Sequence, residues 1–442
     1  MDNNSLNPEA CYIGLDLGTT NLKAAAISSG EGGNVLATVS AAMEYDSDGA
    51  RVEFEAGGFY DKVCGIIKDV SKGLRPMGVC ISSASGNTVL LGADGNPLIP
   101  VISWLDTRAS GDIEAVFGHL EDPADVYSIV GWPLGDYFPL AHLSMIKRVK
   151  PGLIESAAKI GMSSDYINMR LCGAWAIDHS TATTFYLQDQ VAKSWNKRFL
   201  GKLGISEQQL PNLLPTGTKI GEVSAKAAAE TQLPLGTPVF LGSFDHPSAA
   251  IGAGVTKEGK LLLSCGTSWV GFTPVRGRER VISASLLCDP FLESEGLWGS
   301  LFSLSNASQH VDKFLDVIIP ECPQRHKKFD ELAMQSEPGA GGLTVDIYGK
   351  PPADLAKYKP SDVARAIMED VARLIAQKID MLRDYGIAVD DIVMAGGPSH
   401  SPIWPGIVSD AVGMPLKILP NGAYAGAIGA ATIAKTRAAH SG

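Results

Sequence analysis

Two short turns that contain glycine and threonine are the residues of this sequence whose types and spacing most directly suggest chemistry. Each turn lies between two apolar runs: Gly18-Thr19-Thr20-Asn21 near the N-terminus and Gly266-Thr267 past the middle. Such turns expose backbone N–H groups and hydroxyls, which bind phosphate oxygens. Asp16 before the first turn could hold Mg²⁺ through water, and Lys23 after it could neutralise a phosphate in transfer. A plain polar hairpin explains either turn alone, but two such turns favour ATP as the ligand.

Asp245 is the candidate for proton transfer. The apolar run 239–244 predicts a strand, and the small residues after Asp245 predict a helix. A carboxylate at the end of a strand could accept the proton of an attacking hydroxyl during phosphoryl transfer. The alternative is that Asp245 caps the helix. His246 beside it either contacts the substrate or shapes the turn.

Aromatic residues next to polar ones suggest a sugar or a polyol as the acceptor. Trp104 opens the segment Trp-Leu-Asp-Thr-Arg at 104–108. An indole face packs well against a carbon skeleton, while the acid and the base order hydroxyls and loops. Tyr137 could donate a hydrogen bond to the same ligand. The alternative for a tryptophan on a strand is a place in the core.

Two other nucleotide motifs are not supported. The segment 254–260 nearly matches a P-loop, but Leu261 stands where Ser or Thr must reach magnesium, and a strand follows instead of a helix. No G-x-G-x-x-G opens a strand–helix–strand unit, so a dinucleotide-binding fold is not indicated.

Strands and helices must position these residues, and the apolar pattern predicts the same order of elements twice. In each half two strands flank the turn and a helix follows: strands 11–17 and 21–28 with a helix near 58–73, then strands 260–264 and 269–275 with a helix at 361–385. This repeat predicts a duplicated α/β unit. We expect domains at 1–250 and 251–442, with the ligand between them.

Length and composition agree with this organisation. A chain of 442 residues exceeds one hydrophobic core, which favours two domains. With 37 Lys and Arg against 48 Asp and Glu, sequence-independent binding of nucleic acid is not expected. The seven cysteines are dispersed without C-x-x-C, as in a reducing compartment. The sequence has no signal-peptide core and no apolar run of membrane-spanning length, so we expect no membrane association and a cytoplasmic location.

The order of these motifs resembles that of the FGGY carbohydrate kinases. The matching stretches are D-x-G-T-T-N-x-K at 16–23, W-x-D-x-R at 104–108, L-C-G at 171–173, D-x-S at 178–180, the strand before Asp245, the Gly266-Thr267 turn and D-I-V-M-A-G-G-P-S-H-S at 391–401. The resemblance implies an α/β fold of two actin-like (ribonuclease-H-like) domains with a cleft between them. It implies a small sugar bound mainly by the N-terminal domain, with ATP and Mg²⁺ as cofactors, and leaves a homodimer open as the assembly.

The resemblance also implies roles for individual residues. Asp245 would be the catalytic base, Asp16 the magnesium-associated carboxylate, and Trp104 and Tyr137 sugar contacts. The implied phosphate contacts are Gly18, Thr19, Thr20, Asn21, Lys23, Gly266 and Thr267. The implied adenosine contacts are Gly396, Gly397 and Ser401.

The chain departs from the family where the substrate is chosen. The stretch Ser83-Ala84-Ser85-Gly86-Asn87 lacks the His of xylulokinases and the Arg-Glu pair of glycerol kinases, and it is slightly similar to gluconate kinases. His246 stands where Asn or Gln often follows the base, and Asn21 stands where Ser is usual. Ser83, Ala84, Ser85 and His246 are therefore predicted to contact the substrate.

The leading interpretation is an ATP-dependent phosphotransferase that phosphorylates a terminal hydroxyl of a small ketose, polyol or aldonate. Two alternatives belong to other classes. An actin- or Hsp70-like ATPase shares the two turns but does not need Trp104. A catalytically silent sugar-binding protein would not need Asp16, Lys23 and Asp245 together.

Overall fold

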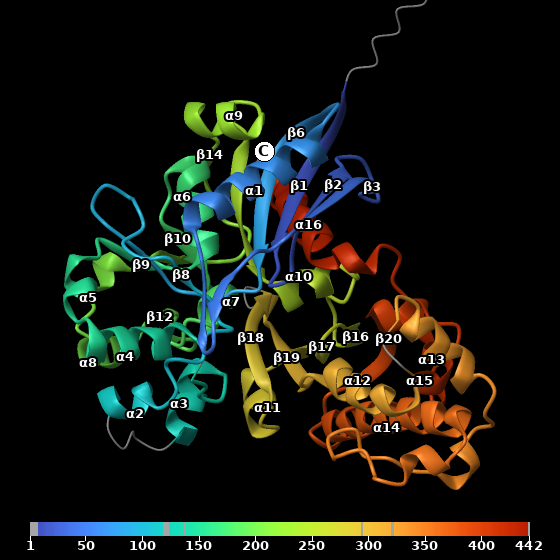
Figure 1. Ribbon diagram of the computed structural model, residues 1–442. Helices are drawn as coiled ribbons and strands as arrows, with labels where there is room; N and C mark the ends of the chain where they lie inside the picture. The colour runs from blue at the N-terminus through green and yellow to red at the C-terminus, as the bar shows by residue number, and fades with distance from the viewer. Residues whose placement is uncertain (1–7, 118–122, 137, 293–294, 320–321, 441–442) are drawn as a thin grey trace, which may run out of the picture. The chain divides into compact units, whose positions relative to one another are not determined.

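The first structural unit is assembled from three separate stretches of chain. The computed structural model describes residues 8–117, 123–136, 138–292, 295–319 and 322–440 (Figure 1). The first unit comprises Met1–Gly254, Asp289–Glu295 and Tyr424–Gly442, and the second comprises Val255–Cys288 and Gly296–Ala423. The C-terminal helix therefore folds with the N-terminal part of the chain.

The main sheet of the first unit has the strand order β14-β15-β6-β1-β2-β3. Its strands are β1 (Glu9–Leu17), β2 (Asn21–Ser28), β3 (Val35–Ala42), β6 (Leu74–Ser83), β14 (Lys219–Glu222) and β15 (Pro238–Phe244). The three strands β1, β2 and β3 form an antiparallel meander, as the turn residues predict, whereas β6 runs parallel to both β1 and β15. A parallel arrangement brings the carboxyl ends of β1, β6 and β15 to one edge.

Two helices cover opposite faces of this sheet. Because side chains alternate along a strand, the odd-numbered apolar residues of β1 join a core with α1 (Ala56–Ser71). The even-numbered residues face α16 (Ala425–His440), where a side chain on Gly14 would lie 1.9 Å from the carbonyl oxygen of Ala427. Glycine at this position therefore lets helix and strand backbones approach closely.

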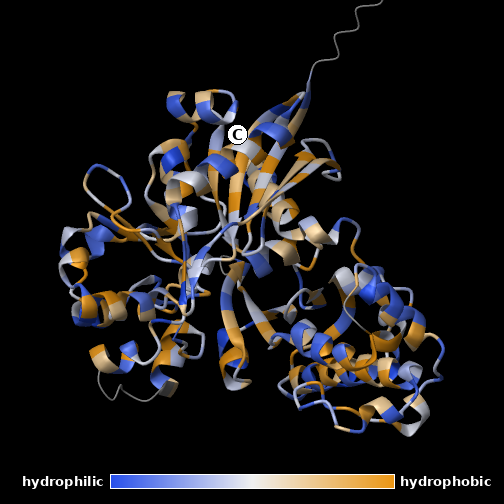
Figure 2. Ribbon diagram, viewed as in Figure 1, coloured by the Kyte–Doolittle hydropathy of each residue, from blue (hydrophilic) through white to orange (hydrophobic). Residues whose placement is uncertain are grey.

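Smaller elements complete the first unit, in which the hydrophobic strands are visible in Figure 2. Short paired strands are β4 (Asp46–Asp48), β5 (Arg51–Phe54) and β8 (Val101–Ile102), β7 (Val89–Leu91) and β9 (Lys159–Gly161), β10 (Ala176–Asp178) and β13 (Asn212–Leu214), and β11 (Gln188–Asp189) and β12 (Ser194–Trp195). The helices are α2 (Asp112–Phe117), α3 (Pro123–Val130), α4 (Pro139–Val149), α5 (Gly152–Ser156), α6 (Ser163–Cys172), α7 (His179–Thr183), α8 (Lys197–Leu203), α9 (Ala225–Thr231) and α10 (Asp245–Gly252). Within the described ranges, no helix is both long and apolar enough to cross a membrane.

The second unit repeats the plan of the first. Its sheet has the order β18-β19-β17-β16-β20-β21, formed by β16 (Gly259–Cys265), β17 (Trp269–Arg276), β18 (Leu287–Leu292), β19 (Leu297–Leu304), β20 (Val389–Gly396) and β21 (Leu416–Ile418). Again an antiparallel meander, β16-β17-β19, is followed by parallel β20 and β21. The strand order and directions agree with the predicted duplication.

The helices of the second unit are α11 (Arg278–Ser283), α12 (Ala307–Ile318), α13 (Arg325–Ala333), α14 (Pro360–Asp384) and α15 (Trp404–Val412). The longest of these, α14, starts with proline at its first position and buries a stripe that includes Val363, Ile367, Val371 and Ile375 at helical spacing. This stripe belongs to the hydrophobic core of the unit.

Candidate active site

Three neighbouring strands of the first unit bring the predicted catalytic and phosphate-binding segments to one edge of the sheet. In the parallel pairs, Leu17 of β1 and Phe244 of β15 both lie opposite Ser83 of β6. The next residues, Gly18, Ala84 and Asp245, therefore leave the sheet side by side. The N–H of Ala84 donates to the carbonyl oxygen of Leu17 at 3.1 Å, which ties two of these exits together.

Asp16 and Asp245 are close enough to interact electrostatically. Burial, and then the charge of Asp245, raises the pKa of Asp16 to about 7, while Lys23 opposite it in β2 acts in the other direction. The Oδ1 atom of Asp16 is buried and has no hydrogen-bond partner in the part of the chain that the structure describes. A buried carboxylate oxygen without a partner, next to a second carboxylate, fits a divalent cation. In the described residues, no cluster of three or more His, Cys, Asp or Glu is arranged to hold a metal ion.

Asp245 is the first residue of α10, and its Oδ1 accepts a hydrogen bond of 2.7 Å from the N–H of His246. The capping position is occupied by Phe244, which has no side-chain cap. The imidazole of His246 lies edge-on to the ring of Phe244, with centroids 5.5 Å apart. Both residues after the strand are half-buried, so the carboxylate lies at the rim of the sheet and not in the core.

A small pocket at the same edge collects several of the predicted sugar and phosphate residues. Its lining consists of Leu17, Gly18, Thr19, Met43, Tyr45, Phe54, Phe59, Ala84, Asn87, Ser103, Trp104 and Ser163. Trp104 Nε1 donates to Thr19 Oγ1 at 2.9 Å, and the hydroxyl of Tyr45 donates to the Thr19 carbonyl at 2.8 Å. The structure therefore brings the first turn and the tryptophan segment together.

The stretch 83–87 divides into buried and pocket-lining residues. Ser83 and Ser85 are each 1% exposed and bond to one another, because Ser83 Oγ accepts from the Ser85 N–H and Ser85 Oγ donates to the Ser83 carbonyl. Ala84 and Asn87 line the pocket instead. Asn87 exchanges two hydrogen bonds with Ser163, at 2.7 and 3.0 Å. Tyr137, the other predicted sugar contact, lies outside the described residues.

Charged residues hold the segment of Trp104 in place. Arg108 Nε donates to both carboxylate oxygens of Asp106, at 3.0 and 2.9 Å, and the guanidinium also contacts Glu53. Asp106, which is fully buried, accepts the N–H of Val52 at 2.9 Å. The acid and base of the W-x-D-x-R motif therefore anchor the loop to β5.

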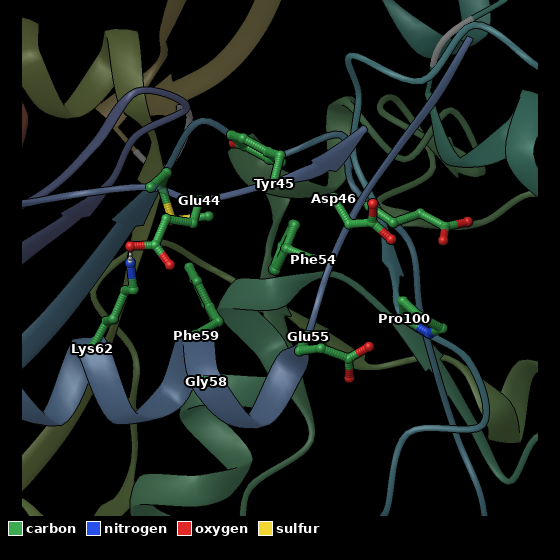
Figure 3. A pocket seen from close by; sticks show the side chains of 11 residues that line it. Glu44, Tyr45, Asp46, Phe54, Glu55, Gly58, Phe59, Lys62 and Pro100 are labelled. Atoms are coloured by element: carbon green, nitrogen blue, oxygen red, sulfur yellow. Dashed lines mark ion pairs between the residues drawn. The ribbon is translucent and has the colours of Figure 1, made fainter. Parts of the chain in front are cut away.

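A larger, open pocket of about 480 Å³ adjoins the small one (Figure 3). The two share Met43, Tyr45, Phe54 and Phe59. The rest of the larger lining includes the acids Glu44, Asp46, Glu53 and Glu55. In Figure 3 the side chain of Lys62 rises from α1 to Glu44, with which it forms an ion pair at 2.9 Å. Among the described residues that line this larger pocket, none belongs to the predicted site.

In the second unit the predicted ATP-binding residues also share a sheet edge. Cys265 of β16 lies opposite Gly396 of β20 in a parallel pair, so Gly266 and Gly397 leave the sheet together. The 266–268 turn is tied to α12, because Ser308 Oγ donates to the Gly266 carbonyl at 2.7 Å and the Ser308 N–H to the Thr267 carbonyl at 3.1 Å.

Two of the predicted adenosine contacts, Gly396 and Ser401, also have a structural role in the backbone around them. Gly396 has φ of 96°, and a Cβ there would lie 2.1 Å from the carbonyl oxygen of Cys265, so only glycine fits. Ser401 Oγ accepts from the N–H groups of Ile403 and Trp404, at 3.2 and 3.1 Å, at the start of α15. A side chain on Gly397, by contrast, would meet nothing within 4 Å.

Sequence reasoning missed two residues that contact the site. Gly426 of α16 lies so close to Asp16 that a Cβ would be 2.6 Å from its Oδ2. No sequence signal marks this glycine. Asp289 is fully buried, and it receives a hydrogen bond of 2.8 Å from Ser180. The sequence does contain a signal for Asp289, because it is the only charged residue in the apolar run 286–292.

The fold defines the class of protein. The structure superimposes on a solved xylulose kinase from Rhodospirillum rubrum with a TM-score of 0.85, over 97% of this chain and 90% of that chain, at 25% identity. This similarity, and the arrangement of a three-stranded meander followed by two parallel strands that both sheets share, define an α/β protein with two actin-like (ribonuclease-H-like) domains, as predicted.

Sequence comparison then gives the family. The profile of the FGGY family of carbohydrate kinases, N-terminal domain, matches residues 11–252, and that of its C-terminal domain matches residues 352–438. The chain belongs to the FGGY family of carbohydrate kinases, which confirms the resemblance seen in its motifs.

Curated relatives of the chain carry different substrate names. A xylulose kinase of Lactococcus lactis is 27% identical over 264 residues, which are 58% of this chain and 52% of that relative. An autoinducer-2 kinase of Photorhabdus laumondii is 25% identical over 94% of this chain and 84% of that relative. The match to the Lactococcus protein thus spans about half of its length.

Proposed function

We propose that the chain is an ATP-dependent kinase of a small, uncharged sugar or polyol, and that Asp245 is the general base. The observation that carries the proposal is the meeting of three strand ends, which brings Asp245, Asp16 and the Gly18 turn to one edge beside a polar pocket. The family supports phosphoryl transfer to an alcohol, and the pocket supports a polyhydroxyl acceptor.

Asp245 would take the proton of the attacking hydroxyl. Its Oδ1 already accepts from His246, so we assign the proton to Oδ2. General-base catalysis of this kind contributes about 10²- to 10⁴-fold in rate. Trp104 would pack against the carbon skeleton, and its hydrogen bond to Thr19 keeps the indole beside the phosphate turn. Holding the acceptor and the base together converts the transfer into an effectively intramolecular step.

Mg²⁺-ATP, when bound, would supply the phosphoryl group and neutralise the charge that develops on it. In the first unit Asp16 would hold the cation through water, and Gly18, Thr19, Thr20, Asn21 and Lys23 would bind phosphate oxygens. In the second unit Gly266 and Thr267 would bind phosphate oxygens. Gly397 would allow adenosine to approach the backbone, since no atom of the described residues lies within 4 Å of where its Cβ would be.

The pocket lining argues for an uncharged acceptor. Among the described residues that line the small pocket, none has a charged side chain. An aldonate carboxylate buried there would lack a cation to balance it, which is costly. Hydroxyl and amide groups of Thr19, Asn87, Ser103 and Ser163, beside aromatic walls, suit the hydroxyls and carbons of a ketose or polyol.

The test is a coupled ATPase screen of pentuloses, tetruloses, hexuloses, polyols and aldonates. Acceptor-dependent turnover with a neutral compound is expected, and gluconate should give less. Asp245→Asn should lower kcat about 100-fold or more while the Kd of ATP changes less than about threefold. Asp69→Asn, which alters an exposed acid on α1, is the matched control and should leave turnover unchanged.

Three outcomes would contradict the proposal. ATP hydrolysis that no acceptor accelerates would favour the actin- or Hsp70-like alternative. Sugar binding without any turnover would favour a silent binding protein. Full turnover in Asp245→Asn would remove the assigned base.

A further inference from the structure

The strand that carries Asp245 is irregular at its end. The parallel pairing of β15 with β6 is regular up to Leu241, then shifts before Phe244. An irregularity of this kind withdraws backbone groups from the ladder, and those groups must bond elsewhere. The N–H of Phe244, one residue before Asp245, donates to Ser180 Oγ at 3.2 Å.

Ser180 is itself oriented by a distant acid. Its hydroxyl donates to Asp289 Oδ2 at 2.8 Å, across 109 positions of sequence. The serine oxygen therefore accepts from Phe244 and gives its proton to Asp289. A hydroxyl has one proton, and Ser180 donates it to Asp289. The lone pairs of the serine oxygen are therefore directed toward the N–H of Phe244. The result is a relay from Asp289 through Ser180 to the backbone that bears Asp245.

The partners of this relay are held firmly in the first unit. Ser180 and Asp289 are both completely buried, and Ser180 lies in α7, a helix capped by Asp178, whose Oδ1 accepts from the Thr181 N–H at 2.8 Å. Asp289 belongs to the short stretch Asp289–Glu295, which packs with the first unit although the residues on either side of it belong to the second. Asp289 lies in β18, whose first residues, Leu287 and Cys288, belong to the second unit.

We propose that Asp289 is a positioning residue which, acting through Ser180, fixes the backbone before Asp245 and so the direction of the catalytic carboxylate. The proposal rests on the function proposed for Asp245. It gives a role to a buried acid whose Oδ1 has no hydrogen-bond partner among the described residues.

The electrostatic environment of Asp289 agrees with a neutral acceptor. Burial raises the pKa of its carboxyl well above the ordinary value, and the charges of Asp178 and Asp245 act in the same direction, opposed by the bond from Ser180. A neutral carboxylic acid still accepts from Ser180 through its carbonyl oxygen. It also adds no negative charge beside the base. Asparagine, which has the same shape and a carbonyl oxygen, should therefore replace it.

The decisive experiment compares Ser180→Ala, Asp289→Leu, Asp289→Asn and the double variant Ser180→Ala/Asp289→Leu. We expect the first two to lower kcat about tenfold or more, with the KM of ATP changed less than about twofold. Asp289→Asn should keep kcat within about threefold of wild type. The double variant should be no worse than the poorer single variant, because both changes break one relay. Additive losses, equal losses in Asn and Leu, or a loss confined to KM would overturn the proposal.

A second measurement separates this proposal from the function on which it rests. Amide hydrogen exchange of the purified protein, without substrate, should show reduced protection at Phe244 in Ser180→Ala and Asp289→Leu. Ser144→Ala is the matched control, because Ser144 is an equally buried serine whose hydroxyl donates only to Leu140 of its own helix. This variant should leave exchange at Phe244 unchanged. Unchanged protection in Ser180→Ala would overturn the relay whatever the enzyme phosphorylates, whereas failure of every acceptor would overturn only the proposed function.

Discussion

At the scale of single residues, Asp16 owes its position to the absence of a side chain on Gly426. The glycine lets α16 touch the carboxylate that we assign to the cation. We predict that Gly426→Ala lowers kcat roughly tenfold, because a Cβ would lie 2.6 Å from Asp16 Oδ2 and push the carboxylate aside. Overpacking should also cost about 1–3 kcal/mol of unfolding free energy. Steady-state kinetics and chemical denaturation measure both effects.

The control for this prediction is Gly65→Ala in α1, where a Cβ would meet nothing within 4 Å. This change should raise the unfolding free energy by about 0.5–1 kcal/mol and leave kcat unaltered. If Gly426→Ala left kcat unaltered, as the control should, the close contact between Gly426 and Asp16 would not matter for catalysis.

His142 gives the stability a pH dependence. Its ring is completely buried, Nδ1 lies 2.9 Å from Thr88 Oγ1, and Nε2 has no hydrogen-bond partner among the residues described by the structure. Burial lowers its pKa from 6.5 to about 4, with a further lowering from Arg108 and an opposing effect of Asp106. Between these two values the unfolded chain binds a proton that the folded chain does not, so stability falls as pH falls.

We therefore predict that wild type loses about 2 kcal/mol more unfolding free energy between pH 7 and pH 5 than His142→Gln does. Urea denaturation at both pH values gives this difference. The subtraction removes the contribution of the buried acids Asp165, Asp178 and Asp289, whose raised pKa values act with the opposite sign. Equal losses in both proteins would refute the assignment to His142.

At the scale of elements, α16 packs against α10 through glycines. A Cβ on Gly429 would lie 1.7 Å from the carbonyl oxygen of Ser248, which is backbone and cannot move aside easily. We predict that Gly429→Ala destabilises the protein by about 2 kcal/mol or more. Thermal or chemical unfolding measures the change. Gly201→Ala, in the last turn of α8, is the control and should be neutral or stabilising, because a Cβ there would meet no described atom within 4 Å.

The elements near the site were largely predictable, because local patterns determine them. The turn residues after Leu17 and Cys265 predicted hairpins, and β1, β2, β16 and β17 have nearly the predicted bounds. The run before Asp245 likewise predicted that this acid follows a strand. These features depend on alternation and turn chemistry within a dozen residues.

Contacts between distant segments were not predictable in the same way. The apolar run around Asp289 predicts a strand, but nothing local says that it reaches Ser180 of another element. The alanine-rich C-terminal helix could cover either sheet. Its close fit to the first sheet depends on Gly14, next to Ala427, and on Gly429, next to Ser248. Ser83 and Ser85 were predicted to contact substrate, and that role stays a prediction, although both hydroxyls have local partners.

At the scale of the whole molecule, the first unit depends on its last stretch. Removal of Tyr424–Gly442 would expose the face of β1 and β6 that α16 covers, including Cys80 and Phe240, which share a core with Ile433. We predict that the truncated chain loses hydrogen-exchange protection in β1 while β16 and β17 of the second unit retain theirs. A synthetic peptide of residues 424–442 should restore the protection of β1. Normal protection of β1 without the peptide would contradict the prediction.

Because α16 completes the first unit, this unit can finish folding only late in the synthesis of the chain. About 400 residues separate β1 from the helix that covers it, which corresponds to roughly 20–80 s of translation at about 5–20 residues per second. For the last part of that time, from the end of β15 to the start of α16 about 180 residues later, the ribosome holds a nascent chain whose first sheet has all its strands but is bare on one face. We expect the second unit to fold before the first is finished, and the unfinished sheet to be the part of the nascent chain that chaperones bind.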